Sequence, residues 1–589
     1  MDDSVGDVIR ISLLGVLALV TIVAAGAFSK KLGVAAPLIL IVVGVGFSFI
    51  PGAPVVVPHE VILLGLLPPI LYSAALTVPV IDFRRNLTSI SLLSVALVIV
   101  TAGITGFILY LLFPQLSLAA GIAIGAVISP TDAVAATALG KRLGLPPRLV
   151  TILEGESLVN DATALVLLRS AVAATAASVA FWDVVGDFVF AVTVSLVIGF
   201  VVGWLTVLVR SKLQDSVLDT AISFAVPFIA FLPAEFVGAS GVLAVVVAGL
   251  YSGHASAKKF SAQSRISERL NWRTLQFVLE NGVFLLMGIQ FTSLISGVQE
   301  DDLSAAAAIW VGLLMTVVVL VVRFAFLVPL LVLLRRQAAA TARQTERWGR
   351  AVERMRARID GNEQLASSAR VQRRSERVEK NLKRREADVA QLRVQGLGWR
   401  GGLVLGWSGM RGVVTLAAAQ SLPEATPYRA QLVLIAFTVA VVTLLVQGGT
   451  LPWLIRLTGI RGTDRAADRR EFATLLDEIS AAGIAVLDNP DFRLPDGEKV
   501  DEEVVERVRH DTLQSVRSAR ERAEHGAGDK ELANSPQRQY RELRREVLQA
   551  ERDALLEARS EGSYPSRILS RAQAMIDMEE TRLEAMDNS

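Results

Sequence analysis

The stretch ILEGESLVNDATALVLL (residues 152–168) sets the carboxylates of Glu156 and Asp161 inside an apolar run. With its flanks, the run is long enough to cross about 30 Å of hydrocarbon as a helix. Successive helical residues are about 100° apart, so Ser157 and Asp161 share one face, and Glu156 and Asn160 share the strip beside it. Because charged groups are costly inside a membrane, the stretch predicts a membrane helix with a functional oxygen cluster.

Similar apolar runs recur along the chain to about residue 457, interrupted by a charged stretch at 336–400. Hydrophobic residues make up 52% of the 589 residues and charged residues 20%, which excludes an ordinary cytosolic enzyme. The chain has no cysteine, which excludes a disulfide scaffold, a thiolate metal site and a cysteine nucleophile. Thirteen spans are predicted, at about 8–28, 34–50, 59–78, 88–113, 116–139, 149–177, 182–210, 217–233, 237–252, 273–294, 305–334, 401–421 and 429–457. We therefore expect an all-α polytopic membrane protein.

The basic residues predict the orientation of these spans. Lysine and arginine fall on alternate connections, such as Lys30-Lys31 and Lys141-Arg142, and are nearly absent from the others. Cytoplasmic loops carry the excess of basic residues. We therefore expect the N-terminus outside the cell membrane and the C-terminus in the cytoplasm, which agrees with an odd number of spans.

Two hydrophilic segments complete the predicted domain organisation. Residues 336–400 form a charged insert within the transmembrane domain (1–457), with 18 basic against 8 acidic residues from Arg335 to Arg400. The composition favours a solvated helical hairpin in the cytoplasm, or a patch that touches anionic lipid headgroups. Residues 458–589 have amphipathic periodicity and predict a helical cytoplasmic tail.

The fifth span, GAVISPTDAVAATALG (residues 125–140), contains a predicted helix break. Pro130 cannot donate a backbone hydrogen bond, and freed carbonyls in hydrocarbon must face protein, water or an ion. Thr131 and Asp132 follow directly. They offer a hydroxyl, a carbonyl and a second carboxylate for a cation; alternatively, Asp132 only caps the second half-helix.

The twelfth span, LVLGWSGMRGVVTLAAA (residues 403–419), is loosened by glycines around Arg411. We expect Arg411 to pair with Glu156, or to neutralise the C-terminal dipoles of half-helices by itself. The fifth and twelfth spans are seven apart, which is typical of inverted repeats made of spans 1–6 and 8–13. Interrupted helices at matching places predict a substrate site near the membrane midplane.

The oxygen cluster suits a hard cation. Asp161 above Ser157 forms a partial cage, which Asp132 and Thr131 of the fifth span are expected to complete. Desolvation of a lone aspartate favours its protonated form, so Asp161 is also a candidate proton carrier. Two other charges inside spans are weaker signals. We expect Glu280 to bond a neighbouring helix rather than the ion, and Arg323 to lie in the bundle interior or to reach an interface.

Five segments, in order along the membrane domain, resemble the monovalent cation/proton antiporter family of sodium/proton exchangers and bacterial NhaP-like proteins. They are LPPILYSAAL (67–76), SPTDAVAA (129–136), GESLVNDATALV (155–166), LENGVFLLMG (279–288) and SGMRGVV (408–414). The resemblance implies a homodimer with a fixed dimerisation domain and a moving core, in which spans 5 and 12 cross. Ser73 is a departure, because many relatives carry an acidic residue there.

The resemblance also assigns roles to the site residues. It implies that Asp161 is the carboxylate shared by cation and proton, and that Na⁺ is bound by Asp161, Ser157, Asp132 and Thr131. Glu156 and Arg411 would form a structural ion pair. Asn160 before Asp161 marks electroneutral members, which implies one cation exchanged per proton.

The sequence therefore predicts a secondary antiporter that exchanges Na⁺, or Li⁺ or K⁺, for H⁺ across the cell membrane. Cation and proton would compete for Asp161 while the site alternates between the two sides. The alternatives are a K⁺/H⁺ antiporter and a gated cation channel. No nucleophile–base set or nucleotide loop is visible in the sequence, so we expect neither an enzyme nor a cofactor. The expected partners are the ions, membrane lipid and a second copy, without nucleic acid.

Overall fold

The chain is analysed as a computed structural model. The structure describes residues 2–50, 58–176, 181–213, 215–298, 304–361, 398–460, 465–488, 500–510 and 536–561, together with residue 513 and scattered residues of 371–389 and 572–580. The chain divides into two compact units, Met1–Gly462 and Thr463–Ser589, which are described separately.

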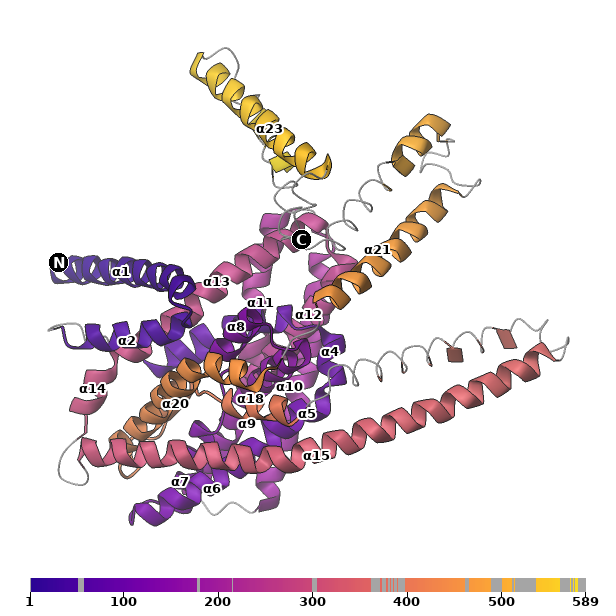
Figure 1. Ribbon diagram of the computed structural model, residues 1–589. Coiled ribbons are helices and arrows are strands. Elements are labelled where there is room, and N and C mark those ends of the chain that lie inside the picture. Colours follow the sequence, from indigo (N-terminus) through magenta and orange to yellow (C-terminus); the bar gives the residue numbers. More distant parts are fainter. Residues whose placement is uncertain are drawn as a thin grey trace. The chain divides into compact units, whose positions relative to one another are not determined.

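The first unit is helical throughout its described residues (Figure 1). Its elements are α1 (Asp2–Leu32), α2 (Ala36–Ser48), the π-helical turn η1 (Val61–Leu66), α3 (Leu67–Thr77), α4 (Val80–Arg85), α5 (Leu87–Ser91), the π-helical turn η2 (Leu92–Ala96), α6 (Leu97–Leu112), α7 (Leu118–Ile128), α8 (Val134–Leu143), α9 (Pro147–Ala176), α10 (Phe181–Arg210), α11 (Ser216–Phe236), α12 (Gly241–Lys259), α13 (Ala262–Ile289), α14 (Phe291–Ser296), α15 (Ala305–Asp360), α18 (Trp399–Trp407), α19 (Val413–Gln420) and α20 (Arg429–Thr458).

The helices confirm an all-α membrane protein. Among the described residues, eight helical segments are long and apolar enough to cross a membrane, and four shorter apolar helices accompany them. Helices occupy each of the predicted spans, including the pairs α7/α8 and α18/α19 that share one span each. Length and composition do not fix the number of crossings, so thirteen stays a prediction.

The two predicted helix breaks are confirmed, and they lie against each other. α7 ends at Ile128, just before Pro130, and α8 begins at Val134; α18 and α19 flank residues 408–412. The backbone N–H of Asp132 donates to the carbonyl of Met410 at 2.7 Å, which joins the two breaks directly. Because residues 130–133 and 409–412 are not helical, their backbone polar groups need partners that a helix would otherwise have supplied.

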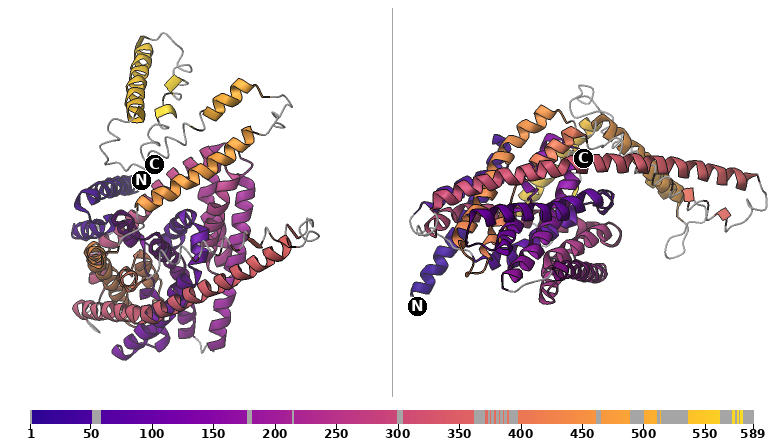
Figure 2. Two further views of the ribbon diagram at one scale, coloured as in Figure 1. Left: turned by 45° about the vertical axis from the view of Figure 1, so that its right-hand side comes forward. Right: turned by 90° about the horizontal axis from the view of Figure 1, so that it is seen from below.

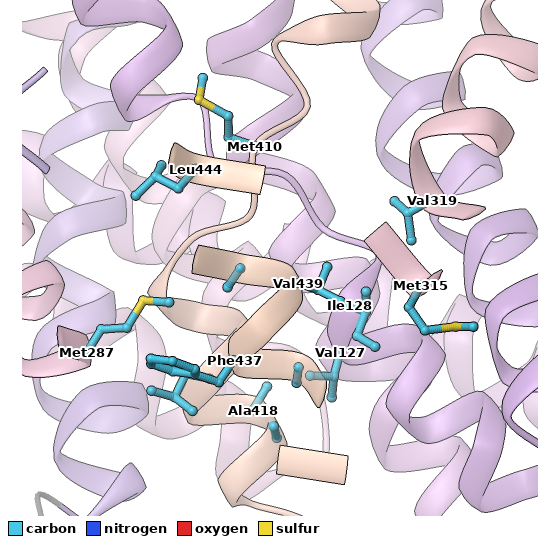
Figure 3. Packing of buried hydrophobic residues seen from close by; sticks show 14 of the residues in the cluster. Val127, Ile128, Met287, Met315, Val319, Met410, Ala418, Phe437, Val439 and Leu444 are labelled. Atoms are coloured by element: carbon cyan, nitrogen blue, oxygen red, sulfur yellow. The ribbon is translucent and has the colours of Figure 1, made fainter. Parts of the chain in front are cut away.

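Close helix packing holds the first break in place. α7 packs tightly on α6 and also contacts α9. A Cβ atom on Gly125 would lie 2.2 Å from the carbonyl oxygen of Ala102, so only glycine permits this approach of α7 to α6. A large apolar cluster surrounds both breaks, with side chains such as Ile128, Met410 and Phe437 (Figure 3). The breaks are therefore embedded in a packed core.

α15 is the longest helix and extends well past its predicted membrane span of 305–334. It runs without interruption for 56 residues to Asp360, as Figure 2 shows from two directions. The guanidinium of Arg385 lies 4.6 Å from the ring centroid of Trp348, and Arg356 pairs with Glu379 at 4.0 Å. Arg385 thus lies near Trp348 and Glu379 near Arg356, an order of contacts that indicates an antiparallel hairpin. Much of the predicted insert between 362 and 397 lies outside the described residues.

The second unit contains two long helices, α21 (Arg465–Leu487) and α23 (Pro536–Glu561), with helical residues also at 502–510. Within this unit Arg509 donates to Asp488 at 2.8 Å, and Arg552 pairs with Glu580. Of the predicted amphipathic tail, most of residues 511–535 and 562–589 lie outside the described residues.

Candidate functional site

A buried arginine satisfies the end of the first half-helix. The Nε of Arg411 donates to the carbonyl of Ile128, the last residue of α7, at 3.1 Å, and its Nη1 donates to the carbonyl of Gly409. The backbone N–H of Arg411 donates to the hydroxyl of Thr443 on α20 at 3.0 Å. A positive charge at a helix C-terminus offsets the dipole and the unpaired carbonyls there. Arg411 therefore lies at the C-terminus of a half-helix, as one of the sequence alternatives expected, and its hydrogen bonds also join the two breaks.

A second buried arginine serves the other broken helix. Arg323 on α15 donates to the carbonyl of Leu405, in the last turn of α18, at 3.1 and 3.3 Å. Its guanidinium also binds both oxygens of Glu156, at 2.5 and 3.0 Å. Arg323 and Glu156 are each 1% exposed. This is a bidentate ion pair shielded from solvent.

The expected pair between Glu156 and Arg411 is therefore corrected, because Glu156 pairs with Arg323. The physical reason is that α15 brings Arg323 to Glu156, while the guanidinium of Arg411 is used by carbonyls of the breaks. The signal for Arg323 was present in the sequence. An arginine in the middle of the apolar run 305–334 requires a buried acceptor, and Glu156 could be assigned to either arginine.

Thr131 is held on two sides. Its hydroxyl donates to Oε1 of Glu156 at 2.8 Å. The side-chain amide of Asn160 donates to the carbonyl of Thr131 at 2.8 Å and to its hydroxyl at 3.0 Å. Asn160 is 1% exposed, and its carbonyl oxygen has no hydrogen-bond partner among the described residues. The Asn160 side chain and the Arg323–Glu156 pair thus fix the non-helical segment of the first break.

Asp132 and Ser157 both contact the start of α8. Oδ1 of Asp132 accepts from the backbone N–H of Val134 at 2.8 Å, which is the capping contact that the sequence left open. Oδ2 of Asp132 lies against Gly412, where a Cβ atom would be only 2.3 Å away. The hydroxyl of Ser157 accepts from the N–H of Ala133 at 3.4 Å. One oxygen of Asp132 is therefore committed to the backbone.

Asp161 lies at a cavity of about 880 Å³, which Asp132, Ser157 and Thr131 also line. Asp161 is 8% exposed, and none of the described residues donates a hydrogen bond to its carboxylate. An unpaired buried carboxylate is unfavourable unless it binds a proton or a cation, so this arrangement suits either ligand.

The cavity has walls from α3, α8, α9 and α13, and other acidic residues line it. Glu154 pairs with Lys141 at 2.7 Å, and Glu268 pairs with Arg210 at 2.7 Å. Oε1 of Glu280 accepts from the amide of Gln276 at 2.6 Å. The sequence suggested that Glu280 bonds a neighbouring helix, but its hydrogen-bond donor is one turn earlier on α13.

Comparison with known proteins identifies the family of the chain. Residues 16–457 match the family described as "Sodium/hydrogen exchanger, transmembrane". An uncharacterized Na⁺/H⁺ exchanger of Mycobacterium tuberculosis is 30% identical over 97% of this chain and 96% of its own length. The sodium, potassium, lithium and rubidium/H⁺ antiporter of Bacillus subtilis is 30% identical over 52% of this chain and 48% of its own.

A solved structure supports the fold. The sodium proton antiporter MjNhaP1 of Methanocaldococcus jannaschii, determined at pH 8, superposes with a TM-score of 0.53 at 16% identity, covering 76% of this chain and 98% of that one. The match confirms that the resemblance seen in the sequence motifs extends to the architecture. The chain thus belongs to the sodium/hydrogen exchanger family, whose members are membrane cation/proton antiporters rather than enzymes.

Proposed function

We propose that this antiporter exchanges one Na⁺ for one H⁺, and that the two ions compete for the carboxylate of Asp161. The observation that carries the proposal is the placement of Asp161 at a cavity, 8% exposed and without a hydrogen-bond donor among the described residues. A carboxylate in this state gains free energy from binding either ion.

The oxygens around Asp161 support a cation site. Asp132, Ser157 and Thr131 line the same cavity and offer the hard oxygen ligands that Na⁺ requires. In this proposal Oδ2 of Asp132 faces the ion while Oδ1 caps α8. The Thr131 hydroxyl donates to Glu156 and accepts from Asn160, so its one remaining acceptor lone pair would face the ion.

Asn160, Glu156 and Arg411 act in support. Asn160 and Glu156 position Thr131, and Arg411 joins the two breaks, with Arg323 as the partner of Glu156. Asn160 donates to a backbone carbonyl and carries no exchangeable charge. A single titrating carboxylate beside it is consistent with one proton per cation.

The movements of Na⁺ and H⁺ are coupled because moving the site without a bound ion is unfavourable. A bare carboxylate carried through a dry passage is expensive, so the site changes sides when Asp161 holds Na⁺ or H⁺. The two ions then never need to be bound together. We propose alternating access, with a moving core around the breaks and a homodimer formed by the remaining helices.

We place the protein in the plasma membrane, with the N-terminus outside and the C-terminus in the cytoplasm. The membrane domain would be 1–457, with a cytoplasmic insert at 336–400 and a cytoplasmic tail at 458–589. The basic residues Lys141, Arg269 and Arg273 line the cavity, and basic residues favour the cytoplasmic side. The cavity would therefore be the inward-facing access to Asp161.

The choice of ion has a second candidate. The name of the Bacillus subtilis relative includes potassium, lithium and rubidium as well as sodium. All of these ions bind the same kind of oxygen, so a K⁺/H⁺ antiporter is the alternative. A gated cation channel is the less favoured reading, because a channel needs no carboxylate that binds protons.

Proteoliposomes that contain the purified full chain and a pH-sensitive dye would test the proposal. Addition of Na⁺ should move protons, and clamping the membrane potential should not change the rate. A larger response to K⁺ than to Na⁺ would change the substrate. No proton movement, together with a current that follows the cation gradient, would reject antiport in favour of a channel.

A further inference from the structure

Glu280 is an acidic residue of the cavity that the exchange mechanism has not used. Among the described residues that line the cavity, Glu154 pairs with Lys141, and Glu268 pairs with Arg210, which also binds Asp219. Glu280 accepts a hydrogen bond from neutral Gln276 and forms no ion pair among the described residues. Besides Asp161 and Asp132, it is therefore the remaining cavity carboxylate without a partner of opposite charge.

Glu280 occupies a defined place along α13. The cavity-lining residues Arg265, Arg269, Arg273, Gln276 and Glu280 follow one another at steps of three or four, which puts them on one stripe of the helix. Arg269 and Arg273 are exposed, whereas Glu280 is half-buried. Glu268 also lines the cavity from this part of α13, but it binds Arg210, so the stripe carries arginines at its exposed end and Glu280 at its half-buried end.

This order matters for a cation that enters. Three arginines at the exposed end repel it, and no acidic residue of α3 lines the cavity to compensate. On α3 the hydroxyl of Ser73 donates to the carbonyl of Ile70, within its own helix, at 2.8 Å. Glu280 lines the same cavity as Asp132 and Asp161, so its negative charge acts on a cation that approaches them through the cavity.

We propose that Glu280 is a positioning residue that holds a hydrated cation against the α13 wall before the cation reaches Asp161. The inference rests on the proposed exchange function and names a residue that governs loading from the cavity side. The unpaired Asp161 at the same cavity is the independent sign that a ligand passes there. Gln276 fixes the orientation of the Glu280 carboxylate through its hydrogen bond.

The electrostatic role predicts an effect on binding rather than on turnover. Removing one charge near the path lowers the local cation concentration and leaves the filled site unchanged. Glu280→Gln should raise the apparent KM for Na⁺ by about 3- to 10-fold when Na⁺ enters from the cavity side, with less effect at high ionic strength. From the other side the KM should stay unchanged, and the maximal rate should be near wild type from both sides.

The test uses the full chain in right-side-out and everted membrane vesicles of a host without its own exchangers. Glu280→Asp keeps the charge and should behave nearly as wild type. The double variant Lys141→Gln/Glu154→Gln removes a neutral pair from the same cavity and serves as the matched control. Gln276→Ala should also raise the KM for Na⁺ from the cavity side only, but by a smaller factor. This variant tests the proposal if Glu280→Gln does not assemble.

Three results would overturn the proposal: an unchanged KM in Glu280→Gln, an equal increase from both sides, or a loss of maximal rate at constant KM. The last of these would show a structural role. Exchange by the wild type and its loss in Asp161→Asn are measured in the same vesicles. A wild type without coupled proton movement would reject the exchange function itself, which separates the two failures.

Discussion

Arg323 and Glu156 lie 167 residues apart in the sequence and form a buried bidentate ion pair. The pair connects α15 to α9, the helix that carries Asp161. Through the hydroxyl of Thr131 it also reaches the first break, and through the carbonyl of Leu405 it reaches the second broken helix. One ion pair therefore ties together the elements that surround the proposed ion site.

Loss of Arg323 should strongly destabilise the protein. Removing one partner leaves the other as a buried unpaired charge, at a cost of about 3–5 kcal/mol. We expect Arg323→Met to lower the thermal unfolding midpoint in detergent markedly, and Arg323→Met/Glu156→Gln to recover part of the loss. Arg169→Gln, which breaks a half-exposed pair with Glu235, is the control and should cost about 1 kcal/mol or less. A stable Arg323→Met would contradict the structural role.

Asp161→Asn should abolish exchange and leave folding intact. The substitution conserves shape, and the carboxylate has no hydrogen-bond donor among the described residues to lose. A ligand that binds only the folded state stabilises it by mass action. Na⁺ should therefore raise the unfolding midpoint of the wild type but not that of Asp161→Asn. Full exchange in this variant would contradict the assignment of Asp161 as the carboxylate that binds Na⁺ and H⁺.

Gly412→Ala should impair the site because its added methyl group would collide with Asp132. A Cβ atom there would lie 2.3 Å from Oδ2 and 2.6 Å from Cβ of Asp132, so Asp132 or the break must move. We expect at least a tenfold loss in kcat/KM for Na⁺, which corresponds to about 1.4 kcal/mol. Gly449→Ala is the matched control, because nothing lies within 4 Å of its Cβ position. Equal activity of the two variants would argue against a role for Asp132 in the site.

Competition between ions at one carboxylate predicts a specific pH effect. Lowering the pH on the side where Na⁺ is added should raise the apparent KM for Na⁺, because protons occupy Asp161. The maximal rate at saturating Na⁺ should remain nearly constant. Initial rates over a range of Na⁺ concentrations at several pH values would measure both. A falling maximal rate at constant KM would point to a proton site separate from the cation site.

Much of the site could be predicted because helix breaks and charges in a membrane span are visible in the local sequence. Pro130 and the glycines around Arg411 mark helix breaks, and a carboxylate in an apolar run marks Asp161, whatever the tertiary structure. The partner of Glu156 could not be chosen in this way. Two buried arginines were available, and only the packing of α15 against the broken helix α18 brings Arg323 to Glu156.

Helix was predicted on both sides of residue 334, but not the continuity of α15 across it, for a related reason. Hydropathy sets the membrane boundary near residue 334, but the Ala-rich sequence that follows also favours helix. The change in solvent therefore does not end the helix. Hydropathy reports where the solvent changes, whereas helix propensity determines where the backbone changes, and in α15 these two places differ.

Because α15 is continuous, the position of its far end depends on the tilt of the helix at the buried site. Arg323, which binds Glu156, and Asp360, at the tip of the hairpin, are joined by about 55 Å of unbroken helix. A tilt of roughly 10° at Arg323 would carry the tip through about 10 Å. Because the chain has no cysteine of its own, a label attached to one introduced thiol near the tip would respond without background. The helix thus converts a small displacement inside the membrane into a large one outside it.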